Sequence, residues 1–518
     1  MNATPAALFN LTQPPSDLPV LVVGAGIMGA GIAQVAAQAG HPVMLFDVRD
    51  GAADQARQQL ATTFDNLVAK QKLTAEAAAQ TLARIQVVTA LESAARAHLV
   101  VEAIVEKLEA KRSLFQQLEA VVSADCVLAT NTSSISVTAI ANGLHHPQRL
   151  VGMHFFNPVP LMKLVEVVSG LQTAPAVADG IFELSKTWGK TPVHARSTPG
   201  FIVNRIARPY YAETLALLQE QAASPAVLDA CLRAVGFRMG PCELMDLIGH
   251  DTNFSVTQSV YEANFFDKRF VPSLVQRELV DGGLLGRKSG RGFYSYAPGA
   301  DKPGVVPDAP PLADLPPFTT LAVAGTGPVA DTLWQRLTAH FRAHLPCLTR
   351  EPDADWTGLR VDGAQLRLTD GRTATELGHT SAHDVAVFDW PTLTAVGEVL
   401  AWAPSVGAPD VWQAQAPVWL QALGFNPQRL TDAPGLVVAR TLSMLVNEAA
   451  DAVQQGVCSP AGADAAMKLG VNYPAGPFDW LARWGAPAVV QVLTALDATY
   501  RGERYRTSPW LRRQLALA

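Results

Sequence analysis

A histidine and a glutamate twelve positions apart are the residues of this sequence best suited to acid–base chemistry. His154 ends an apolar run, and Glu166 lies in the next apolar run, after a proline-rich turn. If the two runs, 150–155 and 164–168, form neighbouring antiparallel strands, the turn would bring the carboxylate beside the imidazole. A carboxylate partner orients an imidazole and stabilises its protonated form, which a general base needs when it takes a hydroxyl proton. A lone histidine in an apolar run is more often a core residue, so the spacing alone leaves that alternative open.

A glycine-rich segment near the start of the chain has a pattern that binds dinucleotides. The motif G-x-G-x-x-G is formed by Gly24, Gly26 and Gly29, with Ile27 and Met28 between the last two. It follows a short run of valine and leucine and opens a helical pattern, which is the context the motif requires. The first glycine permits a tight turn, the second lets a pyrophosphate approach the backbone, and the third allows close packing of helix on strand. The N–H groups at the start of the helix then face the phosphates.

An acidic residue distinguishes this motif from a glycine-rich turn of purely structural role. Asp47 follows Gly29 by 18 residues, at the end of the next apolar run. A carboxylate at this place accepts hydrogen bonds from both ribose hydroxyls and repels a 2′-phosphate. We therefore predict NAD as the cofactor, with Arg49 nearby weakening the preference for NAD over NADP.

The composition narrows the class of protein. With 518 residues, 49% apolar and 17% charged, the chain is of globular type and long enough for about three or four domains. The net charge of -6 and a pI near 6.0 argue against nucleic acid as a partner. The cysteines show no C-x-x-C spacing, so we expect a reducing compartment, the cytoplasm, and no metal site. These cysteines are Cys126, Cys231, Cys242, Cys347 and Cys458.

The start of the chain holds one stretch that resembles a membrane span in length alone. Residues 1–17 are polar and lack the basic region of a secretory signal, so we expect a flexible tail. Residues 20–40 carry no charge and are long enough to cross a membrane. Their cluster of glycines and their glutamines favour a strand followed by a helix instead. We therefore expect no contact with a membrane.

The pattern of apolar runs predicts five segments. Short Val/Leu/Ile runs alternate with Ala/Gln-rich helical stretches at first, which predicts an α/β Rossmann-like domain over 18–197. Long helical patterns then predict an all-helical domain over 198–297. A proline-rich linker, 298–317, leads to a second α/β region over 318–425 and a second helical domain over 426–518.

An internal repeat relates the two helical segments. Many Gly and Pro matches at one constant offset indicate duplication, because such residues mark the same turns in both copies. A shift of 235 positions places Gly189 on Gly424, Pro192 on Pro427, Pro199 on Pro434, Gly200 on Gly435, Val203 on Val438, Arg205 on Arg440 and Glu213 on Glu448.

Three further motifs, in the order of the chain, resemble those of the L-3-hydroxyacyl-CoA dehydrogenase family. They are Asn-Thr-Ser-Ser at 131–134, His-Phe-Phe-Asn-Pro at 154–158 and Thr-Pro-Gly-Phe-Ile-Val-Asn-Arg at 198–205. The resemblance extends over residues 18–297 without a large gap. It implies a Rossmann-like domain followed by a helical one, with NAD as the cofactor.

The resemblance assigns roles residue by residue. It implies that His154 is the acid/base, that Glu166 is its partner, and that Ser133 and Asn204 position the substrate oxygen. From spacing alone, Ser133 would be a helix N-cap and Asn204 a residue of a helix surface. The residues it places along the NAD site are Glu106, Lys111, Asn157 and Lys288. The residues it places against coenzyme A are Thr63 and Lys70, although Lys70 equally fits a solvated charge on a helix.

The second half resembles an incomplete copy. Gly-Thr-Gly-Pro-Val-Ala at 325–330 follows an apolar run like a dinucleotide loop. The offset that gives Asp47 in the first half gives Leu348 here, and the repeat partner of Asn204 is Ala439. We therefore expect a degenerate copy without chemistry, one NAD per chain, and an intramolecular pseudo-dimer of the helical domains. Further association into a homo-oligomer is compatible with this.

The function that the resemblance implies is NAD-dependent oxidation of an L-3-hydroxyacyl-CoA to the 3-ketoacyl-CoA, a reaction type of fatty acid metabolism. The long form resembles bacterial dehydrogenases of phenylacetate breakdown, which act on 3-hydroxyadipyl-CoA, and also 3-hydroxybutyryl-CoA dehydrogenases. Two alternatives are a nucleotide-binding structural protein and a dehydrogenase of a free hydroxy or sugar acid. The structural alternative has no need for His154, Glu166, Ser133 and Asn204 together.

Overall fold

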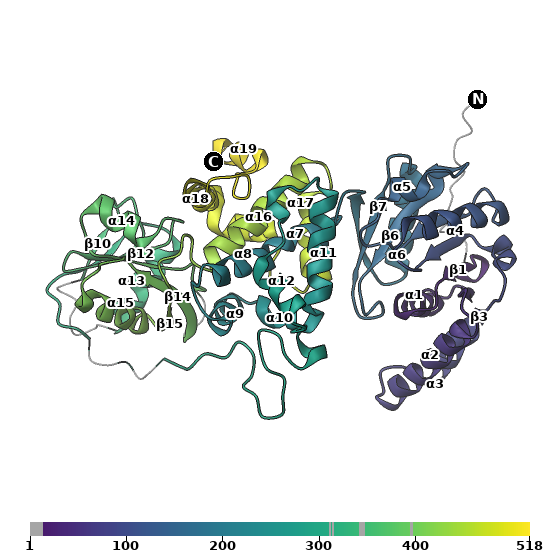
Figure 1. The fold of residues 1–518 in the computed structure, drawn as a ribbon, viewed down its shortest axis with the longest axis horizontal. Coiled ribbons are helices and arrows are strands. Elements are labelled where there is room, and N and C mark those ends of the chain that lie inside the picture. The colour runs from purple at the N-terminus through teal and green to yellow at the C-terminus, as the bar shows by residue number, and fades with distance from the viewer. Residues whose placement is uncertain (1–13, 310–311, 313–314, 341–347, 394–396, 518) are drawn as a thin grey trace. The chain divides into compact units, whose positions relative to one another are not determined.

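The computed structural model of the chain describes residues 14–309, 312, 315–340, 348–393 and 397–517 (Figure 1). The expected flexible tail, 1–17, and Cys347 therefore fall mostly or wholly outside the described residues. The described chain forms two compact units. The first holds the residues up to Arg205 together with Gln455–Val471, and the second holds Ile206–Gln454 and Asn472–Ala518.

The first unit is built on an eight-stranded sheet of order β3-β2-β1-β4-β5-β6-β7-β8 (Figure 1). Its strands are β1 (Val20–Val23), β2 (Val43–Phe46), β3 (Ile85–Val87), β4 (Leu99–Glu102), β5 (Val127–Thr130), β6 (Leu150–Phe155), β7 (Leu164–Ser169) and β8 (Thr191–Arg196). All neighbouring pairs are parallel except β6 and β7, which are antiparallel. The inner strands are continuous runs of Val and Leu because both faces of a parallel sheet are covered by helices. The predicted strand–helix reading of residues 20–40 is confirmed.

The helices of this unit connect the strands and cover the sheet. They are α1 (Ile27–Gln38), α2 (Ala52–Ala69), α3 (Ala75–Arg84), α4 (Leu108–Val121), α5 (Val137–Ala141), α6 (Pro175–Thr187), α7 (Val203–Ile206) and α17 (Pro460–Gly470), with 3-10 turns at Pro15–Asp17, Leu91–Arg96 and Pro147–Arg149. The last of these helices comes from the far end of the sequence, yet it packs against β7 and β8.

The second unit begins with helices and ends with helices. The helices are α8 (Arg208–Gln219), α9 (Pro225–Ala234), α10 (Pro241–Ile248), α11 (His250–Ala263), α12 (Leu274–Asp281), α16 (Val438–Gln454), α18 (Pro477–Tyr500) and α19 (Pro509–Leu517), with 3-10 turns at Lys268–Phe270 and Arg287–Ser289. Several begin with proline in the first turn, where the missing N–H has no partner to lose. Helix α16 packs against α8 and α18.

In the sequence, these two groups of helices are separated by a seven-stranded sheet of order β10-β9-β11-β12-β13-β14-β15, which lies at the left in Figure 1. Its elements are β9 (Leu321–Ala324), α13 (Pro328–His340), β10 (Leu348–Glu351), β11 (Gly358–Val361), β12 (Ala364–Leu368), α14 (Ala374–Ser381), β13 (Val385–Phe388), β14 (Glu398–Pro404), α15 (Asp410–Ala422) and β15 (Phe425–Arg429). Next to β9 stands β11, which is antiparallel to it, where the first sheet has the parallel strand β4. The expected second α/β copy is therefore present with altered topology.

The two helical copies each send a helix onto a sheet. Helix α17 of the second copy packs against β7 and β8, and its repeat counterpart α9 of the first copy packs against β14. The described part of the 298–317 linker is anchored at two carbonyls. Pro303 accepts a hydrogen bond from Arg233 of α9 (2.8 Å), and Pro307 accepts one from Asn426 of β15 (3.0 Å).

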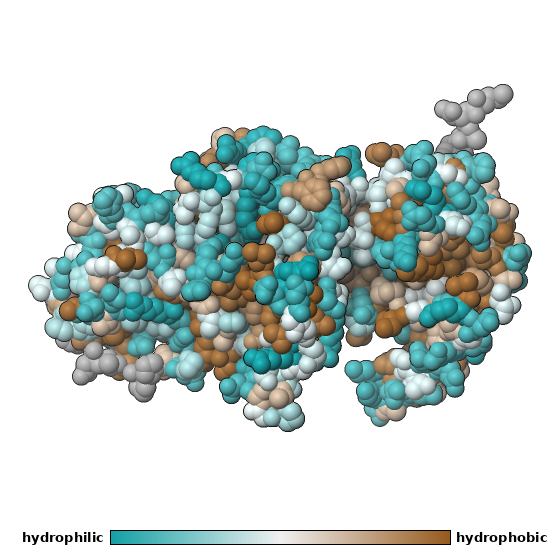
Figure 2. All heavy atoms as spheres, viewed as in Figure 1, coloured by the Kyte–Doolittle hydropathy of each residue, from teal (hydrophilic) through white to brown (hydrophobic). Residues whose placement is uncertain are grey.

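Hydropathy varies over the visible face of the surface and along the described helices. On the face shown in Figure 2, hydrophilic residues predominate, with separate apolar patches on both units. Among the residues that the structure describes, none of the helices combines the length and the apolar character that crossing a bilayer requires.

Candidate active site

The predicted histidine–glutamate pair is formed across two antiparallel strands. His154 of β6 stands in register with Glu166 of β7, and its Nδ1 lies 2.6 Å from Oε2 of the carboxylate. Both side chains are buried. The other carboxylate oxygen accepts hydrogen bonds from the backbone N–H groups of Ile202 (3.1 Å) and Val203 (2.9 Å). With Nδ1 engaged by a held carboxylate, Nε2 is the nitrogen able to exchange a proton with a substrate.

Two aromatic rings complete the walls around the imidazole. The ring of Phe156 lies 4.6 Å from that of His154 between centroids, and the ring of Phe201 lies 5.7 Å away, edge-on. Apolar walls and a fixed carboxylate together hold the imidazole in one orientation. The arrangement suits a general acid/base.

Ser133 belongs to a second cluster, centred on Glu106. One oxygen of this carboxylate accepts hydrogen bonds from the backbone N–H groups of Ser133 (2.9 Å) and Ser134 (3.1 Å), and the other lies 3.1 Å from the ammonium of Lys111. Burial opposes ionisation of Glu106, but the Lys111 charge and these hydrogen bonds lower its pKa below the ordinary value. The cluster therefore fixes the turn that carries Ser133.

Sequence reasoning missed Glu102, the remaining member of this cluster. It is fully buried at the end of β4, and its carboxylate lies 2.6 Å from Lys111 Nζ and 2.7 Å from the backbone N of Ile104. An acidic residue ending an apolar parallel strand is the signal that could have identified it. Lys111, itself buried, thus joins two carboxylates.

The glycine loop has the shape that a pyrophosphate needs. A Cβ atom on Gly24 would lie 2.4 Å from the carbonyl oxygen of Ala103, and one on Gly29 would lie 1.7 Å from that of Gly24. At Gly26, by contrast, the same position is open. Gly26 is also the N-cap of α1 and offers no side-chain cap, so the first N–H groups of this helix are available to an anion. The chain's own residues therefore fit NAD.

Asp47 lies beside this loop as predicted. Its carboxylate accepts hydrogen bonds from the backbone N–H of Ala25 (2.8 Å) and from the guanidinium of Arg49 (3.0 Å). Partial burial opposes ionisation, but the Arg49 hydrogen bonds and the backbone donors lower the pKa of Asp47 to about 2. Asp47 is thus ionised over any ordinary working pH, and Arg49 is bound to it.

The remaining predicted residues lie at three places: near the dyad, on α2, and in the second unit. Asn204 is half-buried on α7, one residue after Val203, and Asn157 is exposed just beyond β6. Thr63 and Lys70 are exposed seven residues apart along α2 and its C-cap, so they share one face of this helix. Lys288 is the one predicted site residue in the second unit, where its Nζ lies 2.5 Å from Asp251.

The second copy has exchanged its chemistry for a structural contact. The offset of 235 places Asp389 at the position of His154 and Ala401 at that of Glu166, and the Asp389 N–H donates to the Ala401 carbonyl (2.9 Å). The Asp389 carboxylate accepts hydrogen bonds from the backbone N–H groups of Val437 (2.8 Å) and Val438 (2.6 Å). These are the repeat counterparts of the two N–H groups that Glu166 holds. Asp389 thus caps the start of α16, and the second copy has Ala401 where the first has the Glu166 carboxylate.

The prediction that Leu348 stands at the position of Asp47 in the second copy is wrong, because the strands pair in a different register. Phe46, the residue before Asp47, accepts a hydrogen bond from Gly24 N, and the equivalent acceptor for Gly325 N is Glu351. The position of Asp47 is therefore taken by Pro352, not by Leu348. A proline has no carboxylate for a ribose. The close backbone approach at the first glycine is kept in both copies: a Cβ on Gly325 would lie 2.5 Å from the carbonyl of Trp356.

The parallel sheet with its glycine loop, followed by a helical domain, is the architecture of a Rossmann-type dehydrogenase. Sequence families agree with this. The 3-hydroxyacyl-CoA dehydrogenase NAD-binding domain matches residues 19–198, and the C-terminal domain of the same name matches 200–296 and again 435–517. The 3-hydroxybutyryl-CoA dehydrogenase reduced Rossmann-fold domain matches 366–434.

Individual relatives are similar over the whole chain or over its first half. A 3-hydroxyadipyl-CoA dehydrogenase of Escherichia coli (strain K12) is 43% identical over 96% of this chain and 97% of its own length. A probable 3-hydroxybutyryl-CoA dehydrogenase of Deinococcus radiodurans is 42% identical over 53% of this chain and 99% of its own length. A crystal structure of 3-hydroxybutyryl-CoA dehydrogenase from Escherichia coli K12 superposes with a TM-score of 0.87 at 43% identity, covering 96% of this chain and 98% of that one.

The chain belongs to the 3-hydroxyacyl-CoA dehydrogenase family. This confirms the expected fold class, the enzyme class and NAD as the cofactor. The double match of the C-terminal domain agrees with the repeat found at an offset of 235.

Proposed function

We propose that the protein oxidises the 3-hydroxyl of an L-3-hydroxyacyl-CoA with NAD, and that one His154–Glu166 dyad per chain does the proton transfer. The observation that carries the proposal is the 2.6 Å contact between the two side chains inside a buried, aromatic-walled site. Bound NAD supplies the hydride acceptor.

The chain's own residues have separate tasks in this proposal. His154 takes the proton of the 3-hydroxyl group while the hydride leaves the carbon that bears this group and passes to NAD. Glu166 stabilises the resulting imidazolium. Ser133 and Asn204 hold the substrate oxygen. The Glu106 carboxylate keeps the Ser133 turn in place through its two backbone N–H contacts. Asn157, Lys111 and Lys288 serve the cofactor, and Thr63 and Lys70 serve coenzyme A.

The acyl group that we propose is 3-hydroxyadipyl or 3-hydroxybutyryl, because full-length and half-length relatives carry these names. The two differ in length and in the terminal carboxylate of the first. A panel of 3-hydroxyacyl-CoA esters of varied length and terminal charge, followed by NADH formation, separates them. Free 3-hydroxy acids and sugar acids form the contrasting arm. Turnover of the free acids and none of the esters would contradict the proposal.

We expect NAD to be used far more efficiently than NADP, and Asp47→Ala to narrow or reverse the difference. The ionised Asp47 repels a 2′-phosphate, and its removal frees the Arg49 guanidinium to attract one. The measurement is kcat/KM with each cofactor for both proteins. Equal efficiency of the wild type with both cofactors would show that Arg49 outweighs Asp47.

We expect calorimetric titration with NADH to give one site per chain. The second glycine loop lacks a carboxylate for the ribose, because Pro352 takes the position of Asp47. Gly26→Val, which fills the open side of the first loop, should abolish this binding. If Gly26→Val still bound one NADH per chain, a second site would exist and the single-site proposal would be wrong.

We propose that the two helical copies act as an intramolecular pseudo-dimer. Ion pairs exchanged between the copies support this. Glu213 of the first copy lies 2.8 Å from Arg440 and 2.8 Å from Arg504, and Glu448 of the second lies 3.7 Å from Arg269. Arg504 is the repeat counterpart of Arg269 at the offset of 235. The limits of the five predicted segments, a cytoplasmic location and association into a homo-oligomer remain predictions.

A further inference from the structure

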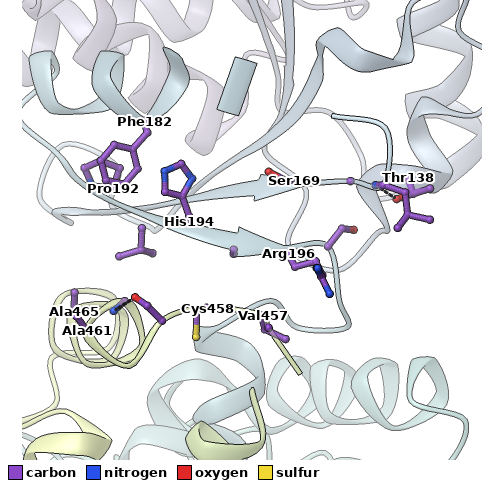
Figure 3. A pocket seen from close by; sticks show the side chains of 18 residues that line it. Thr138, Ser169, Phe182, Pro192, His194, Arg196, Val457, Cys458, Ala461 and Ala465 are labelled. Carbon is purple, nitrogen blue, oxygen red and sulfur yellow. Dashed lines mark hydrogen bonds between the residues drawn. The ribbon is translucent and has the colours of Figure 1, made fainter. Parts of the chain in front are cut away.

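Residues 455–471 come from the copy without chemistry, yet they lie in the unit that holds the His154–Glu166 dyad. This segment runs along β8, where the backbone N–H of Arg196 donates to the Val457 carbonyl (2.9 Å). It then forms α17, which packs against β7 and β8. Figure 3 shows Val457, Cys458, Ala461 and Ala465 of this segment opposite the strands that carry Ser169, His194 and Arg196, across a groove of about 910 Å³.

Helix α17 comes close to the dyad's surroundings at Gly470. A Cβ atom there would lie 2.7 Å from Cδ2 of Leu164, 3.0 Å from Cγ2 of Val203 and 3.7 Å from Cε1 of Phe156. Each of these residues is one step from the dyad. Leu164 lies on the same face of β7 as Glu166, Val203 donates its N–H to the Glu166 carboxylate, and Phe156 packs on the imidazole.

A further contact of the segment points to the same place. Gln455 accepts a hydrogen bond from the buried Arg205 (2.8 Å), two residues after Val203. The segment therefore also holds the backbone turn whose N–H groups bind the Glu166 carboxylate.

The repeat shows that this close approach is particular to the catalytic side. The buried face of α17 consists of small side chains and one methionine: Ala463, Ala466, Met467 and Gly470. The counterparts at the offset of 235 are Leu228, Cys231 and Leu232, which are buried on α9, and Val235, which is the half-buried C-cap of α9. At the buried positions of Ala463 and Ala466, α17 thus carries smaller side chains than α9, which packs against the altered sheet.

From these contacts we propose that Gly470 of α17, together with Gln455, positions the Glu166 carboxylate and the Phe156 ring around His154. Gly470 is a positioning residue, and the duplicated copy is retained to supply it. The inference rests on the proposed function, because the dyad is its object.

The test compares Gly470→Ala with Gly462→Ala in the full chain. Both changes add one methyl to α17, but at Gly462 the methyl meets only Ser459 Oγ (3.1 Å) and Cys458 Cβ (3.8 Å). We expect Gly470→Ala to lower kcat about tenfold and to shift the acidic limb of the pH–rate profile, with the NADH dissociation constant unchanged. Gly462→Ala should match the wild type. Leu164→Val removes the methyl nearest to the new Cβ, so adding it to Gly470→Ala should restore most of the rate.

A measurement that needs no substrate, the rate at which His154 is chemically modified, tests this inference separately from the proposed function. Carbethoxylation of His154 by diethyl pyrocarbonate, followed by mass spectrometry, should be faster in Gly470→Ala than in the wild type and in Gly462→Ala. If Gly470→Ala does not fold, Gln455→Ala removes the Arg205 contact without filling space and should lower kcat about threefold. Unchanged rates, pH profiles and carbethoxylation in a folded Gly470→Ala would overturn the inference. A wild type inactive on every hydroxyacyl-CoA contradicts only the proposed function.

Discussion

His154→Ala and Glu166→Gln are each expected to lower kcat by about 10²–10⁴-fold, because proton transfer by a positioned base contributes on this scale. Glu166→Gln keeps the shape of the side chain but removes the negative charge 2.6 Å from Nδ1, so the imidazolium loses its stabilisation. The glycine loop and Asp47 are untouched. The measurement is single-turnover NADH formation together with the NADH dissociation constant, which should stay within about twofold of the wild type.

The matched control is a histidine–glutamate pair outside the site. His145 is exposed, and its Nδ1 lies 3.1 Å from the largely buried Glu119 carboxylate. His145→Ala should leave kcat unchanged, since this pair has no part in the proposed reaction. A Glu166→Gln enzyme of near-normal rate would reduce Glu166 to a helix-capping residue, the role that Asp389 has in the second copy.

Arg440→Met is expected to lower the free energy of unfolding by about 3–5 kcal/mol, because it leaves part of a buried ion cluster uncompensated. Arg440 and Glu213 are both fully buried, and Tyr505 donates its hydroxyl to the same Glu213 oxygen (3.0 Å). The measurement is calorimetric unfolding of the full chain. Arg277→Met removes an exposed pair with Asp281 and should cost less than about 1 kcal/mol.

The same variant should be more sensitive to acid. Burial would raise the pKa of Glu213, but the charges of Arg504 and Arg440 lower it below the ordinary value. A carboxyl with a lowered pKa adds stability above its unfolded value, and that stability is lost as the pH falls through the folded value. Without Arg440 the folded value rises, so acid unfolding moves to higher pH. If Arg440→Met and Arg277→Met had equal free energies of unfolding at all pH values, the buried ion cluster would not stabilise the contact between the two helical copies.

Local patterns determined the parts of this protein that depend on near neighbours in sequence. The strands at 20–23, 43–46 and 127–130 and the glycine loop follow from a run of β-branched residues and from turns that only glycine allows. His154 and Glu166 belong here too, because an antiparallel pair joined by a short turn places residues twelve apart side by side. The roles of Ser133 and Asn204 came from the family resemblance rather than from their spacing.

Long-range packing decided the rest. Glu106 meets the backbone of Ser133 because the segments that carry them follow the neighbouring parallel strands β4 and β5. The residue at the position of Asp47 in the second copy is Pro352 and not Leu348, because strand register is set by hydrogen bonds and not by residue count. The contact of Gly470 with Leu164 spans about 300 residues of sequence. A periodic pattern of residues cannot predict such a contact. It forms because α17 buries its face of small residues against β7 and β8.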